Sequence, residues 1–155
     1  LSTTPQDLDI CEYLQSKLAD FGIKIKVEVN QAATNNELIA NSKSQFFRKS
    51  WVADYPDAEN YLSLFKSENF APNGPNYTHF KNQQFDQWYN KALSETNDSV
   101  RLSLYQRMDS LVISEAPVVP LFYDEVVRFT QPTISGLGVN PMNLLVLKYA
   151  KKSTE

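Results

Sequence analysis

One stretch of twenty residues, 46–65, limits most strongly what this 155-residue chain can fold into. It begins with an aromatic run, residues 46–51, which is typical of a buried strand. Tyr55-Pro56 then breaks regular structure, because the residue before a proline is kept out of the helical region. Asp57 follows as a predicted helix N-cap, and apolar side chains come after it at helical spacing. Strand, polar loop and helix in this order are typical of α/β proteins, which present side chains at the carboxyl ends of their strands.

The residues before this stretch alternate between helical and extended patterns. A helix is predicted over residues 6–20, and Gly22 is expected to end it in the left-handed conformation. Residues 23–29 alternate apolar and charged side chains, as a half-buried strand does. Thr34 and Glu37 form a capping box that predicts a short helix to about residue 42. With the aromatic run that follows, this order predicts parallel strands joined by helical crossovers.

The second half of the chain begins with a long polar connection, residues 66–81, rich in asparagine, glycine and proline. Loops of this length in compact domains are often functional. Two amphipathic helices are predicted next, one over residues 85–93 and one that Asp98 caps and Pro117 ends. Short apolar strands are predicted over residues 118–123, 126–130 and 144–149.

Composition excludes several classes of function. The net charge is −3 and the basic residues are scattered, so nucleic acid is not an expected partner. No apolar run approaches the roughly 20 residues that span a bilayer. The single cysteine, Cys11, lies on the apolar face of a predicted helix and is expected to be a buried thiol. Phosphate-loop, nucleophile-elbow and zinc-ligand patterns are missing, so no cofactor, metal or enzymatic activity is predicted.

Residues 51–62, Trp-Val-Ala-Asp-Tyr-Pro-Asp-Ala-Glu-Asn-Tyr-Leu, resemble the Trp-x-Ala-Asp-Tyr-Pro-Asp-Pro signature of the oligopeptide- and dipeptide-binding proteins of ABC transporters. Ala58 stands where the family usually has its second proline. Residues 18–27, 77–86 and 101–123 resemble further motifs of the same family, in the same order. Four motifs in order are far more specific than any one of them. Members of the family are about three times as long, so the chain resembles the C-terminal part of one.

This resemblance implies an α/β fold, the second lobe of a type II periplasmic binding protein, with a mostly parallel sheet flanked by helices. Residues 1–125 would form the lobe, and residues 126–155 would return to the first lobe. The implied function is capture of small peptides outside the cytoplasmic membrane and their delivery to the permease subunits of an ABC importer. The implied location is the periplasm or the cell surface, with a lipid anchor as one arrangement. An apolar tail without its native neighbours is expected to favour self-association.

The resemblance also implies six ligand-binding residues. Asp54 would receive the α-amino group of the peptide, and Arg48 would meet its C-terminal carboxylate. Trp51 and Tyr55 would lie beside the ligand or pack under the sheet. Asn76 and Tyr77 would frame the cleft, whereas Asp57 is expected to cap a helix without touching the ligand.

Two alternatives stay open. Relatives in the family take other solutes, and the aromatic residues are compatible with an oligosaccharide. A hydrolase with a carboxylate pair is the alternative from another class, because 18 acidic residues make close pairs inevitable.

Overall fold

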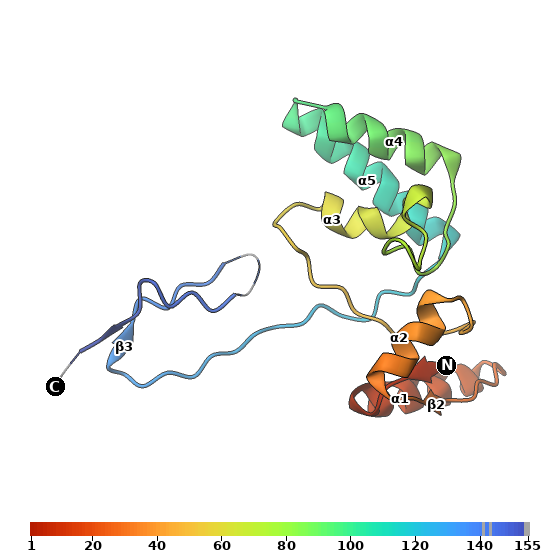
Figure 1. Ribbon diagram of the computed structural model, residues 1–155, viewed down its shortest axis with the longest axis horizontal. Helices are drawn as coiled ribbons and strands as arrows, with labels where there is room; N and C mark the ends of the chain where they lie inside the picture. Colours follow the sequence, from red (N-terminus) through yellow and green to blue (C-terminus); the bar gives the residue numbers. More distant parts are fainter. Residues whose placement is uncertain (141, 143, 154–155) are drawn as a thin grey trace.

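Three parts follow one another along the chain in the computed structural model, which describes residues 1–140, 142 and 144–153 (Figure 1). The N-terminal part contains β1 (Ser2–Thr3), η1 (Pro5–Asp7), α1 (Leu8–Asp20), β2 (Glu28–Val29) and α2 (Ala32–Ala40). The helical part contains α3 (Glu59–Leu62), η2 (Ser63–Phe65), η3 (Ser67–Asn69), α4 (Gln83–Ser94) and α5 (Asp98–Glu115). The C-terminal arm contains β3 (Ile134–Ser135) and β4 (Lys151–Lys152) and extends away from the helices.

The first predicted helix and its C-terminal cap are confirmed. Gly22 follows α1 with a φ of 78°, a conformation that glycine adopts without steric cost. The backbone N–H of Ile23 donates to the carbonyl of Leu18 at 3.0 Å, which closes the helix end. Cys11 is fully buried on the inner face of α1, as predicted.

The sheet is much smaller than the sequence patterns predict. β1 pairs in parallel with β2, and Ser2 forms a further parallel bridge with Phe47. The strand predicted over residues 23–29 is therefore reduced to its last two positions, and residues 46–51 form no strand. The prediction was wrong in extent because β1 offers only two residues for pairing. An alternating pattern shows that a segment can be a strand, but only a neighbouring strand can supply its hydrogen bonds.

Two predicted helix starts were also wrong. α2 begins at Ala32 after Gln31, so Thr34 lies inside the helix and makes no capping bond. Before α5 the cap is Asn97, whose side-chain oxygen accepts hydrogen bonds from Ser99 N and Val100 N at 3.0 and 3.3 Å. Both Asn97 and Asp98 are good capping residues, and the neutral amide takes the position.

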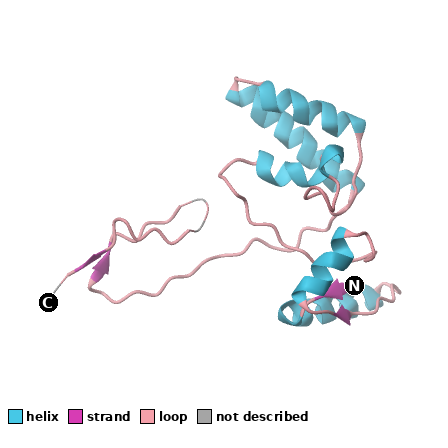
Figure 2. Cartoon of the chain, in the orientation of Figure 1, coloured by secondary structure: helices cyan, strands magenta, loops and turns pink. Residues whose placement is uncertain are grey.

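The core of the molecule lies among α3, α4 and α5, which pack together in Figure 2. Phe85 and Met108 have no exposed surface, and burying a side chain of this size contributes about 1.5–3 kcal/mol to stability. Phe80 and Phe65 meet Phe85 edge-on, with ring centroids 5.7 and 6.4 Å from it. Part of the aromatic content of the sequence thus packs in this core, whereas other aromatic residues, among them Tyr13 and Phe129, are exposed. The buried members of this core are Leu62, Phe80, Phe85, Tyr89, Ala92, Leu104, Tyr105, Met108 and Val112.

The predicted strands of the C-terminal arm are not formed. Residues 119–131 have no regular secondary structure, and residues 144–149 are turns and irregular structure. The arm instead pairs β3 with β4, antiparallel, with Ile134 opposite Lys152. The apolar composition of these segments favoured strands. They do not form because the described part of the chain contains no sheet with which they could pair. The predicted division of the chain after residue 125 stays a prediction.

Candidate ligand-binding site

The loop between residues 51 and 58 is folded around one side chain, that of Asn60. The indole Nε1–H of Trp51 donates to Asn60 Oδ1 at 2.8 Å, and the backbone N–H of Asp54 donates to the same oxygen at 3.2 Å. Asn60 Nδ2 lies 3.5 Å from Asp54 Oδ2. Trp51 and Asp54, predicted as ligand-binding residues, are thereby held by a common neighbour.

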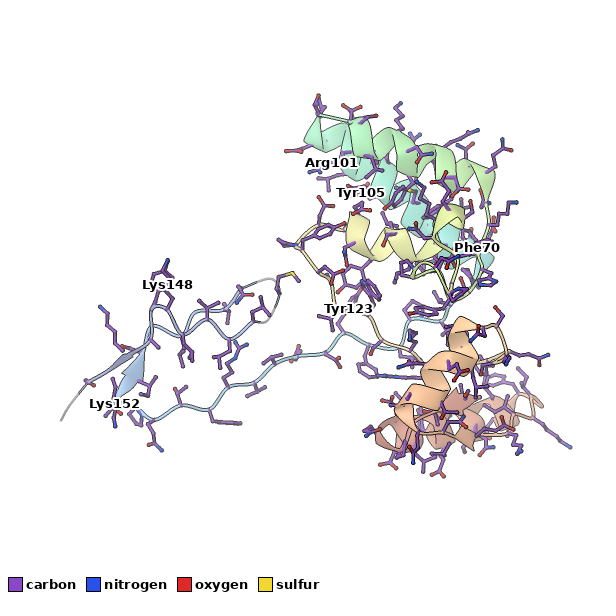
Figure 3. The ribbon with its side chains drawn as sticks, viewed as in Figure 1. Phe70, Arg101, Tyr105, Tyr123, Lys148 and Lys152 are labelled. Atoms are coloured by element: carbon purple, nitrogen blue, oxygen red, sulfur yellow. The ribbon has the colours of Figure 1, made fainter. Side chains whose placement is uncertain are left out.

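The start of α3 is fixed by Asp57. Its Oδ1 accepts a hydrogen bond from the backbone N–H of Glu59 at 2.9 Å, which confirms the predicted cap. Its Oδ2 accepts from Arg101 Nη1 at 3.1 Å, and this pair ties the loop to α5. Figure 3 shows Arg101 beside Tyr105 on α5, with the guanidinium carbon 5.9 Å from the centre of the Tyr105 ring.

Tyr55 turns back onto α3. Its hydroxyl donates a hydrogen bond to Glu59 Oε2, and this bond raises the pKa of the Tyr55 phenol. Glu59 therefore has a local partner. Tyr55 is exposed, so the face of its ring is accessible from solvent.

Arg48 is occupied by a partner within the chain. Its Nη1 donates to Asp7 Oδ2 at 3.1 Å, and the two side chains are only 17% and 25% exposed. The structure thus shows a paired arginine. The contact of Arg48 with a peptide carboxylate stays a prediction and would require exchange of Asp7 for the ligand.

Asn76 and Tyr77 belong to the loop between η3 and α4. Asn76 is fully buried, and its Nδ2 donates to the carbonyls of Lys66 and Phe80 at 3.0 and 2.9 Å. It supports the loop from inside. Tyr77 is half-buried, with Lys49 Nζ 4.1 Å from the centre of its ring. Their contact with a ligand stays a prediction.

The electrostatics of the loop single out Asp54. Three acids lie close in sequence, but Asp57 is paired with Arg101 and Glu59 accepts from Tyr55. Asp54 is exposed, and among the described residues its carboxylate meets only the neutral amide of Asn60. It keeps its negative charge unneutralised, which suits a small cation such as an ammonium group.

Sequence reasoning missed Asn60. One signal could have found it: asparagine is a poor helix former that competes for backbone hydrogen bonds, yet here it stands in a helix between Glu59 and apolar residues. The residue is only 4% exposed, and the hydrogen bonds that its amide makes with Trp51 and Asp54 explain why it is tolerated there.

The cysteine and the histidine of the chain, together with the potential metal ligands, were the remaining candidates for chemistry. No group of three potential metal ligands occurs in the described ranges. Cys11 is buried in α1, whereas His79 stacks on Phe70 and its Nε2 lies 3.0 Å from the carbonyl oxygen of Ala71. A shallow groove of about 670 Å³ between α4 and α5 contains none of the predicted ligand-binding residues.

Comparison with known proteins identifies the class to which this loop and fold correspond, the periplasmic binding proteins with the type II fold. A dipeptide-binding protein from a Pseudoalteromonas species, solved in complex with Met-Leu, superposes with a TM-score of 0.74. It is 25% identical, and the match covers 94% of this chain and 29% of that one. The predicted α/β class is confirmed by this likeness.

The chain is similar in sequence to the family 5 solute-binding proteins. The family described as bacterial extracellular solute-binding proteins, family 5 Middle, matches residues 1–73. The dipeptide-binding protein DppE of Bacillus subtilis is 29% identical over 98% of this chain and 27% of its own length. The probable deoxycholate-binding periplasmic protein YgiS of Escherichia coli is 31% identical over 65% of this chain and 18% of its own length. The chain thus spans less than a third of the relatives it matches.

Proposed function

We propose that this chain contributes the lobe of an ABC-importer binding protein that receives the amino terminus of a small peptide. The observation that carries the proposal is the exposed, unneutralised carboxylate of Asp54, held within the loop that resembles the family signature. The carboxylate offers a point charge to the α-ammonium group. The relatives named as dipeptide-binding proteins support a peptide as the ligand.

The neighbouring predicted residues take complementary roles in this proposal. The Trp51 indole and the Tyr55 ring flank the peptide backbone beside Asp54. Tyr77 borders the site, and Asn76 keeps the loop of Tyr77 in shape through its buried hydrogen bonds. Arg48 contributes if a peptide carboxylate replaces Asp7 as its partner.

The whole protein then acts by capture and delivery rather than by turnover. Two lobes close on the peptide in a hinge motion, and the loaded protein docks on the permease subunits of the importer. The cycle uses no cofactor and takes place in the periplasm or at the cell surface. The relative YgiS, which is named as a periplasmic protein, supports this location. No helix in the described part of the chain is long and apolar enough to cross a membrane.

A second candidate ligand is an amphipathic anion, because the relative named as a probable deoxycholate-binding protein is 31% identical to this chain. The charge of Asp54 discriminates between the two. A carboxylate attracts a peptide ammonium and repels a bile-acid anion. Replacing Asp54 with asparagine should therefore weaken peptide binding and strengthen binding of deoxycholate.

The test is a thermodynamic cycle by calorimetry on the protein that contains this chain, with Asp54→Asn and with free and N-acetylated peptides. Loss of one partner of a buried charge pair costs about 2–5 kcal/mol, so affinity should fall roughly 30-fold or more. Acetylation of the peptide should cause a similar loss in the wild type and little further loss in the variant, because both changes remove the same pair.

Asp109→Asn, which removes an exposed acid of α5, is the matched control and should leave affinity unchanged. Additive losses from the mutation and the acetylation would exclude Asp54 as the ammonium partner. If the peptide is hydrolysed during the titration, the proposal that the protein binds peptides without converting them is wrong.

A further inference from the structure

Asn60 occupies an unusual position for a polar side chain. It lies in the four-residue helix α3 and is 4% exposed, yet its amide points back to the loop that precedes the helix. Two N–H donors, Trp51 Nε1 and Asp54 N, converge on its Oδ1 at 2.8 and 3.2 Å. An oxygen is the only end of the amide that can accept both, so the orientation of the side chain is fixed.

The other end of the amide is then directed at the carboxylate. With Oδ1 committed to the two donors, Nδ2 faces Asp54 Oδ2 at 3.5 Å. Among the described residues, Asp54 Oδ1 accepts no hydrogen bond and is left for a ligand. One side chain thus determines the position of the Asp54 backbone, the direction of its carboxylate and the direction of the Trp51 indole.

The helix that carries Asn60 is itself anchored from two sides. Leu62 is buried in the core, and Asp57 holds the first turn while it is bound to Arg101. The amide therefore acts from a rigid support, which a positioning residue needs.

The neutrality of the amide is as important as its geometry. Arg101 neutralises Asp57, and an acid paired in this way attracts a cation only weakly. Asn60 holds Asp54 without adding charge, so the carboxylate keeps its full attraction for a cation. The two acids of the loop are distinguished by their partners, an arginine for the structural one and an amide for the exposed one.

We propose that Asn60 is a positioning residue that directs the Asp54 carboxylate and the Trp51 indole toward the ligand. This role of Asn60 rests on the proposed function, since the Asp54 carboxylate is oriented in order to bind the peptide ammonium group. Asn60 does not touch the ligand; it acts through the two residues that it holds. Its substitution should therefore weaken binding more strongly while Asp54 carries its charge than when that charge is removed.

The first test needs no ligand. In nitrogen–proton NMR spectra of the chain, the indole N–H signal of Trp51, assigned with Trp51→Phe, should shift and exchange faster with solvent in Asn60→Ala. In Asn60→Asp, which retains an acceptor oxygen, the indole N–H should stay protected from solvent exchange. This second variant keeps the test valid if the alanine variant fails to fold. Asn69→Ala is the control, because Asn69 Nδ2 bonds the carbonyl of Ser63 and touches neither Trp51 nor Asp54. An unchanged Trp51 signal in folded Asn60→Ala, or its loss in folded Asn60→Asp, would overturn the proposed contact.

The second test measures peptide affinity in the protein that contains this chain. Asn60→Ala and Asn60→Asp should each weaken binding roughly tenfold, since a hydrogen bond to a charged group is lost. In the Asp54→Asn background the Asn60→Ala loss should be clearly smaller, because the part that acts through the Asp54 charge is already gone and only the part through Trp51 remains. Equal losses in both backgrounds, or no loss in either Asn60 variant, would show that Asn60 does not act through Asp54. If wild type binds no peptide, the proposed function fails, and the indole signals still decide whether Asn60 positions Trp51.

Discussion

At the scale of single residues, Tyr105 shows how the anchor of the loop depends on pH. It is buried on α5 beside the Asp57–Arg101 pair. Burial raises the pKa of the Tyr105 phenol, and the nearby Asp57 carboxylate raises this pKa further. The folded protein therefore favours the neutral phenol more strongly than the unfolded chain does.

The sign of the resulting pH dependence follows from this shift. An unfolded tyrosine loses its proton near pH 10, before the folded one does, so the unfolded state is stabilised above that pH. The free energy of unfolding should be unaffected by Tyr105 below about pH 9 and should fall as the pH rises through 10. In urea titrations, Tyr105→Phe should remove much of this alkaline loss. Tyr123→Phe, which changes an exposed tyrosine of the arm, is the control, and an equal effect of the two variants would contradict the assignment.

At the scale of elements, α3 is too short to be stable alone, because a single helical turn fixes several residues for few hydrogen bonds. Its stability comes from its anchors, of which the Asp57–Arg101 pair is accessible to mutation. Arg101→Gln should lower the free energy of unfolding by about 1 kcal/mol, a modest value because the two side chains are about a third exposed.

Lys17→Gln is the matched control for this variant. Lys17 pairs with Asp20 at 3.8 Å on the surface of α1, and both side chains are more than half exposed. Its loss should be too small to measure reliably. If urea unfolding gives the same change for both variants, the pair at Arg101 is an ordinary surface contact and not an anchor of α3.

The elements also show what the sequence could and could not reveal. α1, α4 and α5 were predictable because a helix satisfies its own backbone and buries one side, a pattern contained in the helix itself. The strands were not, since the two residues of β1 decide how much of residues 23–29 can pair. In the site, Trp51 and Asp54 were found through the motif. Asn60 was missed because its role depends on three-dimensional contacts with residues six and nine positions earlier.

At the scale of the whole molecule, the C-terminal arm leaves apolar side chains uncovered. Figures 1 and 3 show it running away from the helical part, with Tyr123 near its beginning. Phe122, Val127 and Phe129 are 57%, 69% and 95% exposed. Exposed apolar side chains that lie close together along a segment form a surface on which another chain can pack. We expect the isolated chain to associate as its concentration rises.

Sedimentation velocity over a hundredfold range of concentration measures this association. The double variant Phe122→Ser and Phe129→Ser should shift it to higher concentration, because it removes two of the exposed aromatic rings of the arm. Phe21→Ser, at the end of α1, changes an equally exposed phenylalanine outside the arm and should have no effect. A wild-type chain that stays monomeric throughout the range would contradict the expectation.

The pairing of β1 also requires a long loop to close when the chain folds. Ser2 N donates to the carbonyl of Phe46, and Ser2 O accepts from Arg48 N, so β1 is joined to residues more than forty positions later in the chain. Closing such a loop costs conformational entropy before any contact compensates for it. α4 and α5, in contrast, are joined by three residues and meet at once. When the unfolded chain refolds, α4 and α5 should therefore meet before β1 finds its partners at Phe46 and Arg48.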